Sequence, residues 1–185
     1  RRQRQMCIRD SPNSFLQVNH DQAQAMYNKA LSYIADSNNN VIDAYCGIGS
    51  ISLNLAQKAG HVYGIEIVPQ AVVNANENKK INNISNATFI CGKCEDEIEK
   101  LVNIKDIDTI VVDPPRKGCD ETLLETMVEM NPDRIVYVSC DSATLARDVK
   151  FLRANGYELK DVTPVDQFPH TVHVEVVCCL HRVNS

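Results

Sequence analysis

The chain has 185 residues, of which 44% are hydrophobic, and its formal net charge at pH 7 is −5. Its length and composition fit one globular domain with a sizeable core. The acidic balance argues against a domain that holds nucleic acid by charge alone, because phosphate binding depends on Lys and Arg. No run approaches the roughly 18 apolar residues of a membrane span, and residues 1–15 lack the apolar stretch of a signal peptide. We therefore expect a cytoplasmic protein that does not enter a membrane.

The first predicted element is a helix over residues 20–35, and Asn19 or His20 is expected near its N-cap. Downstream, short β-rich runs alternate with segments whose apolar residues recur at helical spacing. This alternation predicts parallel strands joined by right-handed helical crossovers, with helices on both faces of the sheet. The fold class is therefore α/β with a doubly wound, Rossmann-like sheet. The five predicted parallel strands cover residues 40–45, 61–67, 86–91, 107–113 and 134–140.

The tail, residues 157–182, has a different pattern, with two β-rich runs around a Pro-containing turn and no helix between them. We expect a closing antiparallel hairpin. In its second run, strand alternation puts Glu175 on the same face as Thr171 and His173, a face that is either solvated or turned toward the cleft. The sequence shows no repeat or linker, so residues 20–185 are predicted to form one domain after a lead-in segment, residues 1–19.

A glycine loop follows the first predicted strand in "DAYCGIGSIS". Gly47 and Gly49 allow a tight turn and a close approach of a ligand to the backbone at a helix start. The second predicted strand brings Glu66 to its end, where an acid can bind ribose hydroxyls. Together these features indicate an adenosine-containing cofactor, while a plain strand-to-helix turn is the structural alternative. Ser52 replaces the third small residue of a dinucleotide fingerprint, which disfavours NAD.

Two later strands also end in residues with ionisable or nucleophilic side chains. In "VVDPPRKGC" two prolines fix the backbone after Asp113, and a carboxylate at the end of an apolar strand is costly to bury without a partner. In "YVSCDSATLARD" the strand ends at Cys140, and a helix is predicted over residues 142–152. Because a helix N-terminus favours the thiolate, we expect a lowered pKa for the Cys140 thiol.

The other cysteines, of eight in all, are interpreted as reduced thiols, since nothing in the sequence indicates export. Cys91 and Cys94 form a C-x-x-C pair, but the chain has no second pair and no paired His to complete a zinc site, so no metal is predicted. Small buried core residues are expected at Cys46, Cys119, Cys178 and Cys179.

Four motifs in order, "DAYCGIGSISL", "VVDPPRKGC", "YVSCDSATLARD" and "FPHTVHVE", resemble those of the S-adenosylmethionine-dependent RNA 5-methyluridine methyltransferases. The resemblance is strongest to the branch that acts on 23S ribosomal RNA, and it runs from about "SFLQVN" to the last strand. It covers the catalytic domain, a class I methyltransferase sheet. Asp141 and Ser142 depart from the family pattern, in which many relatives have Asn and Pro, and Ser50 often appears there as Thr.

The resemblance implies S-adenosylmethionine as cofactor and a uridine of RNA, flipped out or single-stranded, as substrate. It implies that the Cys140 thiolate attacks carbon 6 of uracil so that carbon 5 can take the methyl group, and that Glu175 then accepts the carbon 5 proton. Asp113 would orient the uracil edge, and we expect a monomer. Cofactor contacts are implied for Gln17, Tyr45, Gly47, Gly49, Ser50, Glu66 and Asp113.

Other functions are considered beside this one. A transfer RNA substrate is the nearest alternative, since no RNA-reading domain is recognised in the chain. An adenine amino methyltransferase also uses a D-P-P turn, but an aromatic residue usually follows it, whereas this chain has Arg116, and Cys140 would have no task. A nicotinamide-dependent oxidoreductase or a nucleotide-binding module without catalysis leaves the thiol unexplained as well.

Overall fold

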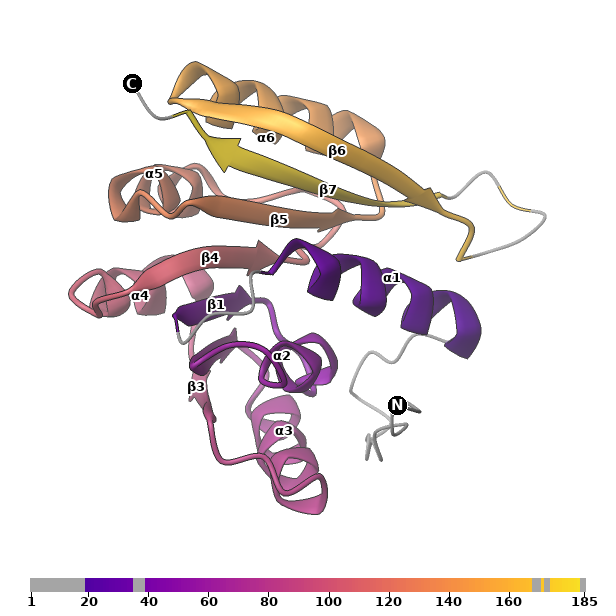
Figure 1. Cartoon of the computed structure of the whole chain (residues 1–185), viewed down its shortest axis with the longest axis vertical. Helices are drawn as coiled ribbons and strands as arrows, with labels where there is room; N and C mark the ends of the chain where they lie inside the picture. Colours follow the sequence, from indigo (N-terminus) through magenta and orange to yellow (C-terminus); the bar gives the residue numbers. More distant parts are fainter. Residues whose placement is uncertain (1–18, 35–38, 168–170, 172–173, 184–185) are drawn as a thin grey trace.

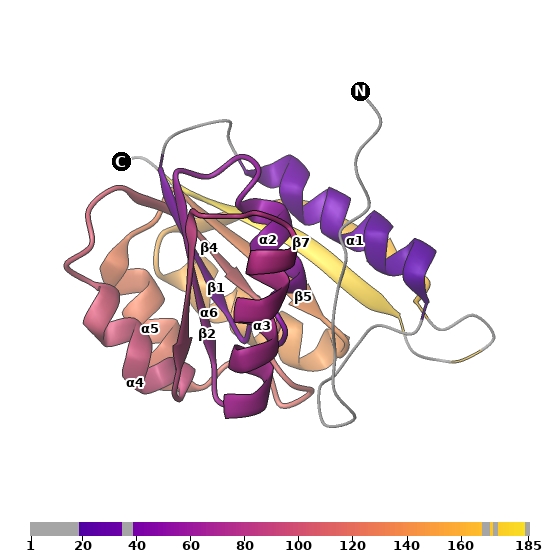
Figure 2. The same cartoon turned by 90° about the horizontal axis from the view of Figure 1, so that it is seen from below.

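The computed structural model describes residues 19–34, 39–167, 171 and 174–183. Gln17 and His173, both named above, lie outside the described residues. A central sheet is covered by helices on both faces, so the chain forms three layers (Figures 1 and 2). This arrangement confirms the predicted α/β class.

The sheet has seven strands in the order β3-β2-β1-β4-β5-β7-β6. The pairs formed among β1 to β5 are all parallel, whereas β7 lies antiparallel between β5 and β6. The predicted parallel sheet and the closing hairpin are both confirmed. The strands are β1 (Asn40–Ala44), β2 (His61–Glu66), β3 (Ala87–Cys91), β4 (Ile107–Val112), β5 (Arg134–Ser139), β6 (Tyr157–Val165) and β7 (Glu175–Arg182).

The first helix precedes the parallel strands, and later helices connect them. The first helix begins as predicted, because the Asn19 side chain accepts a hydrogen bond from the Gln22 N–H. The last follows β5, where the Asp141 side chain caps it by accepting from the Ala143 and Thr144 N–H groups. The helices are α1 (His20–Tyr33), α2 (Ser50–Leu55), α3 (Pro69–Ile81), α4 (Cys94–Ile98), α5 (Glu121–Met130) and α6 (Ser142–Ala154), with a 3₁₀ turn at Glu99–Leu101.

Strand alternation divides the core into two clusters, one on each face of the sheet. Val41 and Val111 pack with α1 and α2 on one face, and Ile42 and Ile110 pack with α4, α5 and α6 on the other. Figure 2 shows α3 beside α2, with α4 and α5 across the sheet. Strands that are buried on both faces explain the nearly continuous apolar runs in the sequence.

Candidate active site

The sheet register brings three candidate residues to one edge of the sheet. Val112 of β4 pairs with Tyr137 of β5, and Ser139 of β5 pairs with Val176 of β7. Because β7 is antiparallel, its first residue lies at the carboxyl edge of the parallel strands. The next residues outward from these pairs are Asp113, Cys140 and Glu175.

Glu175 is buried, whereas Thr171 is exposed and lies outside β7, so the predicted alternation does not extend to Thr171. β7 begins at Glu175, whose exposed fraction is 5%, whereas Val174 before it is 45% exposed. Its carboxylate is therefore turned inward at the edge that carries Asp113 and Cys140. Burial raises the pKa of Glu175, and the Arg116 guanidinium opposes that rise.

Asp113 lies beside other acids. Burial raises its pKa to about 8, and the charges of Glu175 and Asp43 add to the rise. Asp43 of β1 is fully buried, accepts a hydrogen bond from the Ser52 hydroxyl, and has a pKa raised to about 7, chiefly by burial. No residue of the described chain hydrogen-bonds the second carboxylate oxygen of Asp43. Burial and the repulsion between these carboxylates therefore favour the protonated form of Asp113 at neutral pH.

The prediction of a lowered thiol pKa at Cys140 is wrong. The thiol is half-buried and its pKa is raised, first by desolvation and then by the charges of Glu175 and Asp113, with Arg116 acting in the opposite direction. The N-terminus of α6 serves another group, because the Ala143 and Thr144 N–H groups both donate to Asp141. Those bonds hold the pKa of Asp141 below its usual range.

The glycine loop is joined to the acid that ends β2. The Gly47 N–H donates to one Glu66 carboxylate oxygen at 3.0 Å, and the Val68 N–H donates to the other at 2.8 Å. The Glu66 side chain remains half-exposed. Two backbone bonds therefore fix its orientation while leaving lone pairs for a further donor.

The two glycines of this loop have different roles. Both have left-handed backbone conformations, with φ of 54° at Gly47 and 82° at Gly49. A Cβ at Gly47 would meet no atom within 4 Å, whereas a Cβ at Gly49 would lie 2.8 Å from the Phe89 ring. Gly47 thus borders open space, whereas Gly49 is packed closely against Phe89.

Tyr45 and Ser50 flank the loop in different ways. Tyr45 has a φ of 67°, and its hydroxyl donates to Glu95 at the start of α4. Ser50 is 8% exposed and hydrogen-bonds Tyr27 of α1. The pKa of Tyr27 is raised to about 12 by burial and by the Asp113 charge. Tyr27 therefore links the loop to the edge that carries Asp113. The apolar pattern of this helix in the sequence does not indicate that Tyr27 contacts the glycine loop.

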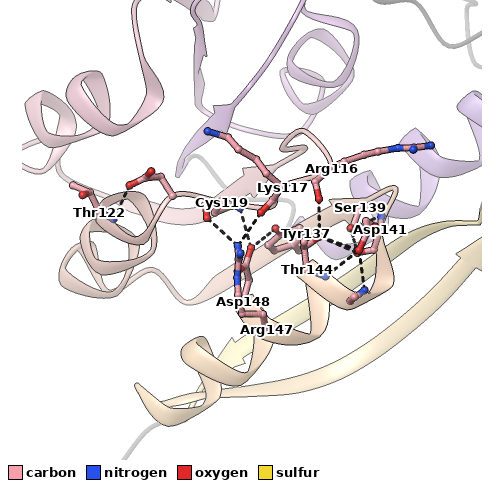
Figure 3. A network of polar contacts seen from close by, with 12 residues as sticks. Arg116, Lys117, Cys119, Thr122, Tyr137, Ser139, Asp141, Thr144, Arg147 and Asp148 are labelled. Atoms are coloured by element: carbon pink, nitrogen blue, oxygen red, sulfur yellow. Dashed lines mark hydrogen bonds and ion pairs between the residues drawn. The ribbon is translucent and has the colours of Figure 1, made fainter.

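A polar network fastens the loop after β4 to α6 (Figure 3). The buried Asp148 carboxylate accepts from the Cys119 N–H at 2.9 Å and from the Tyr137 hydroxyl at 2.6 Å. Arg147 pairs with Asp148 and donates to the carbonyls of Lys117 and Cys119.

Thr144 of α6 makes a further contact with the same loop, donating its hydroxyl to the Arg116 carbonyl at 3.1 Å. The loop that carries Asp113 and Arg116 is thus held against the helix that follows Cys140. Sequence reasoning missed this network, because nothing in "SATLARD" shows that Asp148 is buried.

The other described cysteines differ in their exposure. Cys91 is exposed at the end of β3 and Cys94 is buried at the start of α4. Within the described ranges, no group of three or more His, Cys, Asp and Glu side chains could hold a metal ion. The four cysteines assigned to the core, Cys46, Cys119, Cys178 and Cys179, are buried.

None of the helices in the described ranges is long and apolar enough to cross a bilayer.

The solved structures that are similar to this fold include two methyltransferases. The Pyrococcus abyssi tRNA (uracil-54, C5)-methyltransferase, solved in complex with S-adenosyl-L-homocysteine, aligns with a TM-score of 0.80 and 36% identity over 91% of this chain and 40% of that chain. A precorrin-6y C5,15-methyltransferase from Geobacter metallireducens aligns with a TM-score of 0.73 at 17% identity over 96% of this chain and 94% of its own. The second likeness concerns the fold alone.

Curated relatives are closer in sequence. An uncharacterized RNA methyltransferase of Bacillus cereus is 57% identical over 95% of this chain and 38% of its own length. Another, of Enterococcus faecalis, is 54% identical over 93% of this chain and 38% of its length. The chain thus spans under two-fifths of the length of these relatives. A family model described as tRNA (uracil-5-)-methyltransferase matches residues 2–183, so the chain belongs to that family, and the resemblance seen in its motifs is confirmed.

Proposed function

We propose that this chain is the catalytic domain of an enzyme that transfers a methyl group from S-adenosylmethionine to carbon 5 of a uridine in RNA. The observation that carries the proposal is the convergence of Cys140, Asp113 and Glu175 on one edge of the sheet. A thiol between two acids of raised pKa matches a reaction that needs a nucleophile, a proton acceptor and a group that orients uracil.

The residues at the glycine loop fit the proposed cofactor. The half-exposed Glu66 carboxylate is fixed by two backbone N–H groups and can accept from ribose hydroxyls. Open space over Gly47 lets a ligand approach the backbone there. Ile67 is 55% exposed beside Glu66 and offers an apolar surface to an adenine ring. Tyr45, Ser50 and Asp113 remain proposed contacts, and Gln17 belongs to the same proposal.

Bound S-adenosylmethionine supplies an electrophilic methyl group. The Cys140 thiolate attacks carbon 6 of uracil, which gives carbon 5 the character of an enolate carbon and makes it nucleophilic. After methylation, Glu175 accepts the carbon 5 proton, and the bond between sulfur and carbon 6 breaks with return of the electron pair to sulfur. Asp113, with a pKa of about 8, is largely neutral at pH 7 and can donate a hydrogen bond to a uracil carbonyl.

Arg116 has an electrostatic part in this proposal. It lowers the pKa values of both Cys140 and Glu175 and so favours the charged forms that the reaction uses. Its carbonyl is held by Thr144, which keeps this residue close to the end of β5. An adenine amino methyltransferase would have no use for a thiol there.

Membership of the family does not specify which RNA is the substrate. The motifs favour 23S ribosomal RNA, whereas the Pyrococcus abyssi enzyme acts on uracil 54 of tRNA, so tRNA stands as the second candidate. We place the reaction in the cytoplasm, catalysed by a monomer whose residues 20–185 form one domain.

The test is mass spectrometry of ribosomal and transfer RNA from cells with and without the gene. Loss of one 5-methyluridine from 23S RNA supports the first candidate, and loss of one from tRNA supports the second. A pattern of 5-methyluridine that does not change in either RNA would contradict the proposed function.

A further inference from the structure

A groove runs along the outer side of the molecule between α6 and the edge strand β6, and its volume is about 580 Å³. Figure 1 shows these two elements side by side at the end of the sheet. Most of the residues that line the groove are apolar, and its charged residues, Lys150 and Arg153, belong to α6. The lining includes Ser142, Val149, Lys150, Arg153, Leu159 and Val162.

The groove starts at the catalytic edge. Ser142 lies two residues after Cys140, at the first turn of α6. A helix rises about 1.5 Å per residue, so Arg153 lies roughly 17 Å further along the groove. A chain that leaves the site beside Cys140 can therefore continue along α6 without crossing the body of the protein.

The helix side of the groove carries cations, while Glu158 of β6 pairs with Lys160 and lies near enough to Arg153 for that charge to lower the pKa of Glu158. The cations of α6 are Arg147, Lys150 and Arg153, spaced by three residues and all exposed, whereas its single acid, Asp148, is fully buried. Arg147 is engaged with Asp148 and the loop carbonyls. Lys150 and Arg153 remain at the groove. This separation of charge is notable in a chain whose net charge is −5.

We propose that this groove holds the single-stranded RNA next to the target uridine, with phosphates at Lys150 and Arg153 and a base against Val149 and Val162. The inference rests on the proposed function and adds the path of the substrate to it. A phosphate backbone is the chemistry that the exposed cations of α6 recognise, and the apolar lining accepts the face of a base. Local charge thus lets an acidic domain hold RNA.

The test compares two double variants of the full-length protein. Lys150→Gln with Arg153→Gln removes the proposed contacts, and Lys80→Gln with Lys105→Gln removes the same charge at exposed positions on α3 and before β4. We expect a roughly tenfold loss of affinity for an RNA oligonucleotide in the groove variant alone. Its salt slope should also fall by about 1.4, because each single-strand phosphate contact contributes about 0.7. Binding of S-adenosylhomocysteine should be equal in both variants.

A photo-crosslinking residue at Val162, whose side chain is 51% exposed, identifies the occupant directly. Capture of the RNA strand next to the target supports the proposal. Capture of a protein segment instead, or equal RNA affinity in the groove and control variants, overturns it. If the wild-type protein methylates no uridine, the proposed function fails separately, because affinity, salt slope and crosslinking do not depend on turnover.

Discussion

The Tyr137 hydroxyl donates a hydrogen bond of 2.6 Å to Asp148, which joins the centre of β5 to the helix that follows Cys140. The acceptor is fully buried and also takes the Cys119 N–H and the Arg147 guanidinium. Because removing one member of a buried charged network leaves the others unpaired, these residues should matter for stability as much as for the site.

For Asp148→Asn we expect a loss of about 2 kcal/mol in the free energy of unfolding, since the amide keeps one acceptor but loses the charge that pairs with Arg147. Tyr137→Phe, which removes a single hydroxyl, should cost about 1 kcal/mol. Urea denaturation measures both. Equal stability of Asp148→Asn and wild type would mean that the network does not hold the loop.

Glu66→Ala should weaken binding of S-adenosylhomocysteine by about 1 to 3 kcal/mol, because it removes a fixed acceptor for ribose hydroxyls. Calorimetry gives the affinity. Glu125→Ala is the matched control, since Glu125 is an exposed acid on α5 away from the glycine loop. An unchanged affinity in Glu66→Ala would refute the assignment of the cofactor site.

Most of the fold could be predicted from the sequence, because apolar runs such as residues 107–113 and 134–140 mark strands buried on both faces. The strand-end residues followed from the rule that parallel strands present their carboxyl ends together. The environment of Cys140 could not be predicted in this way. Whether the pKa of its thiol is lowered by the helix N-terminus or raised by nearby acids depends on distances across β4, β5 and β7.

The roles of Tyr27 and Asp148 were also beyond the sequence. Tyr27 reaches the glycine loop from α1, a helix far from it along the chain, and Asp148 is the buried residue on an otherwise cationic helix. Such contacts are set by tertiary packing, which leaves no periodic signal. The same holds for Gly49, whose close neighbour Phe89 belongs to β3.

The raised pKa of Cys140 predicts a pH dependence. A thiol with a raised pKa is protonated at neutral pH, so its alkylation by iodoacetamide should rise with pH and reach its midpoint above the ordinary thiol value. A background with Cys91→Ser and Cys7→Ser removes the exposed thiol among the described residues and the thiol that lies outside them. In that background Glu175→Gln should lower the midpoint, and Arg116→Gln should raise it. The same midpoint in all three proteins would contradict the electrostatic account.

Glu175→Gln should also change the course of the reaction. The amide cannot accept the carbon 5 proton, so the methylated uridine should stay joined to Cys140 and a stable protein–RNA complex should accumulate with ordinary RNA. Denaturing gel electrophoresis detects this complex, and Glu125→Gln, at an exposed position on α5, serves as the control. Turnover at the wild-type rate without a trapped complex would assign the proton to another acceptor.

The central claim is that Cys140 is the nucleophile, and RNA containing 5-fluorouridine tests it most directly, because fluorine cannot leave carbon 5 as a proton does. Mass spectrometry of the digested complex should find the methylated nucleotide on the peptide that contains Cys140. Cys140→Ser should form no adduct while it still binds S-adenosylhomocysteine. An adduct on Cys119, or an adduct that persists in Cys140→Ser, would contradict the account.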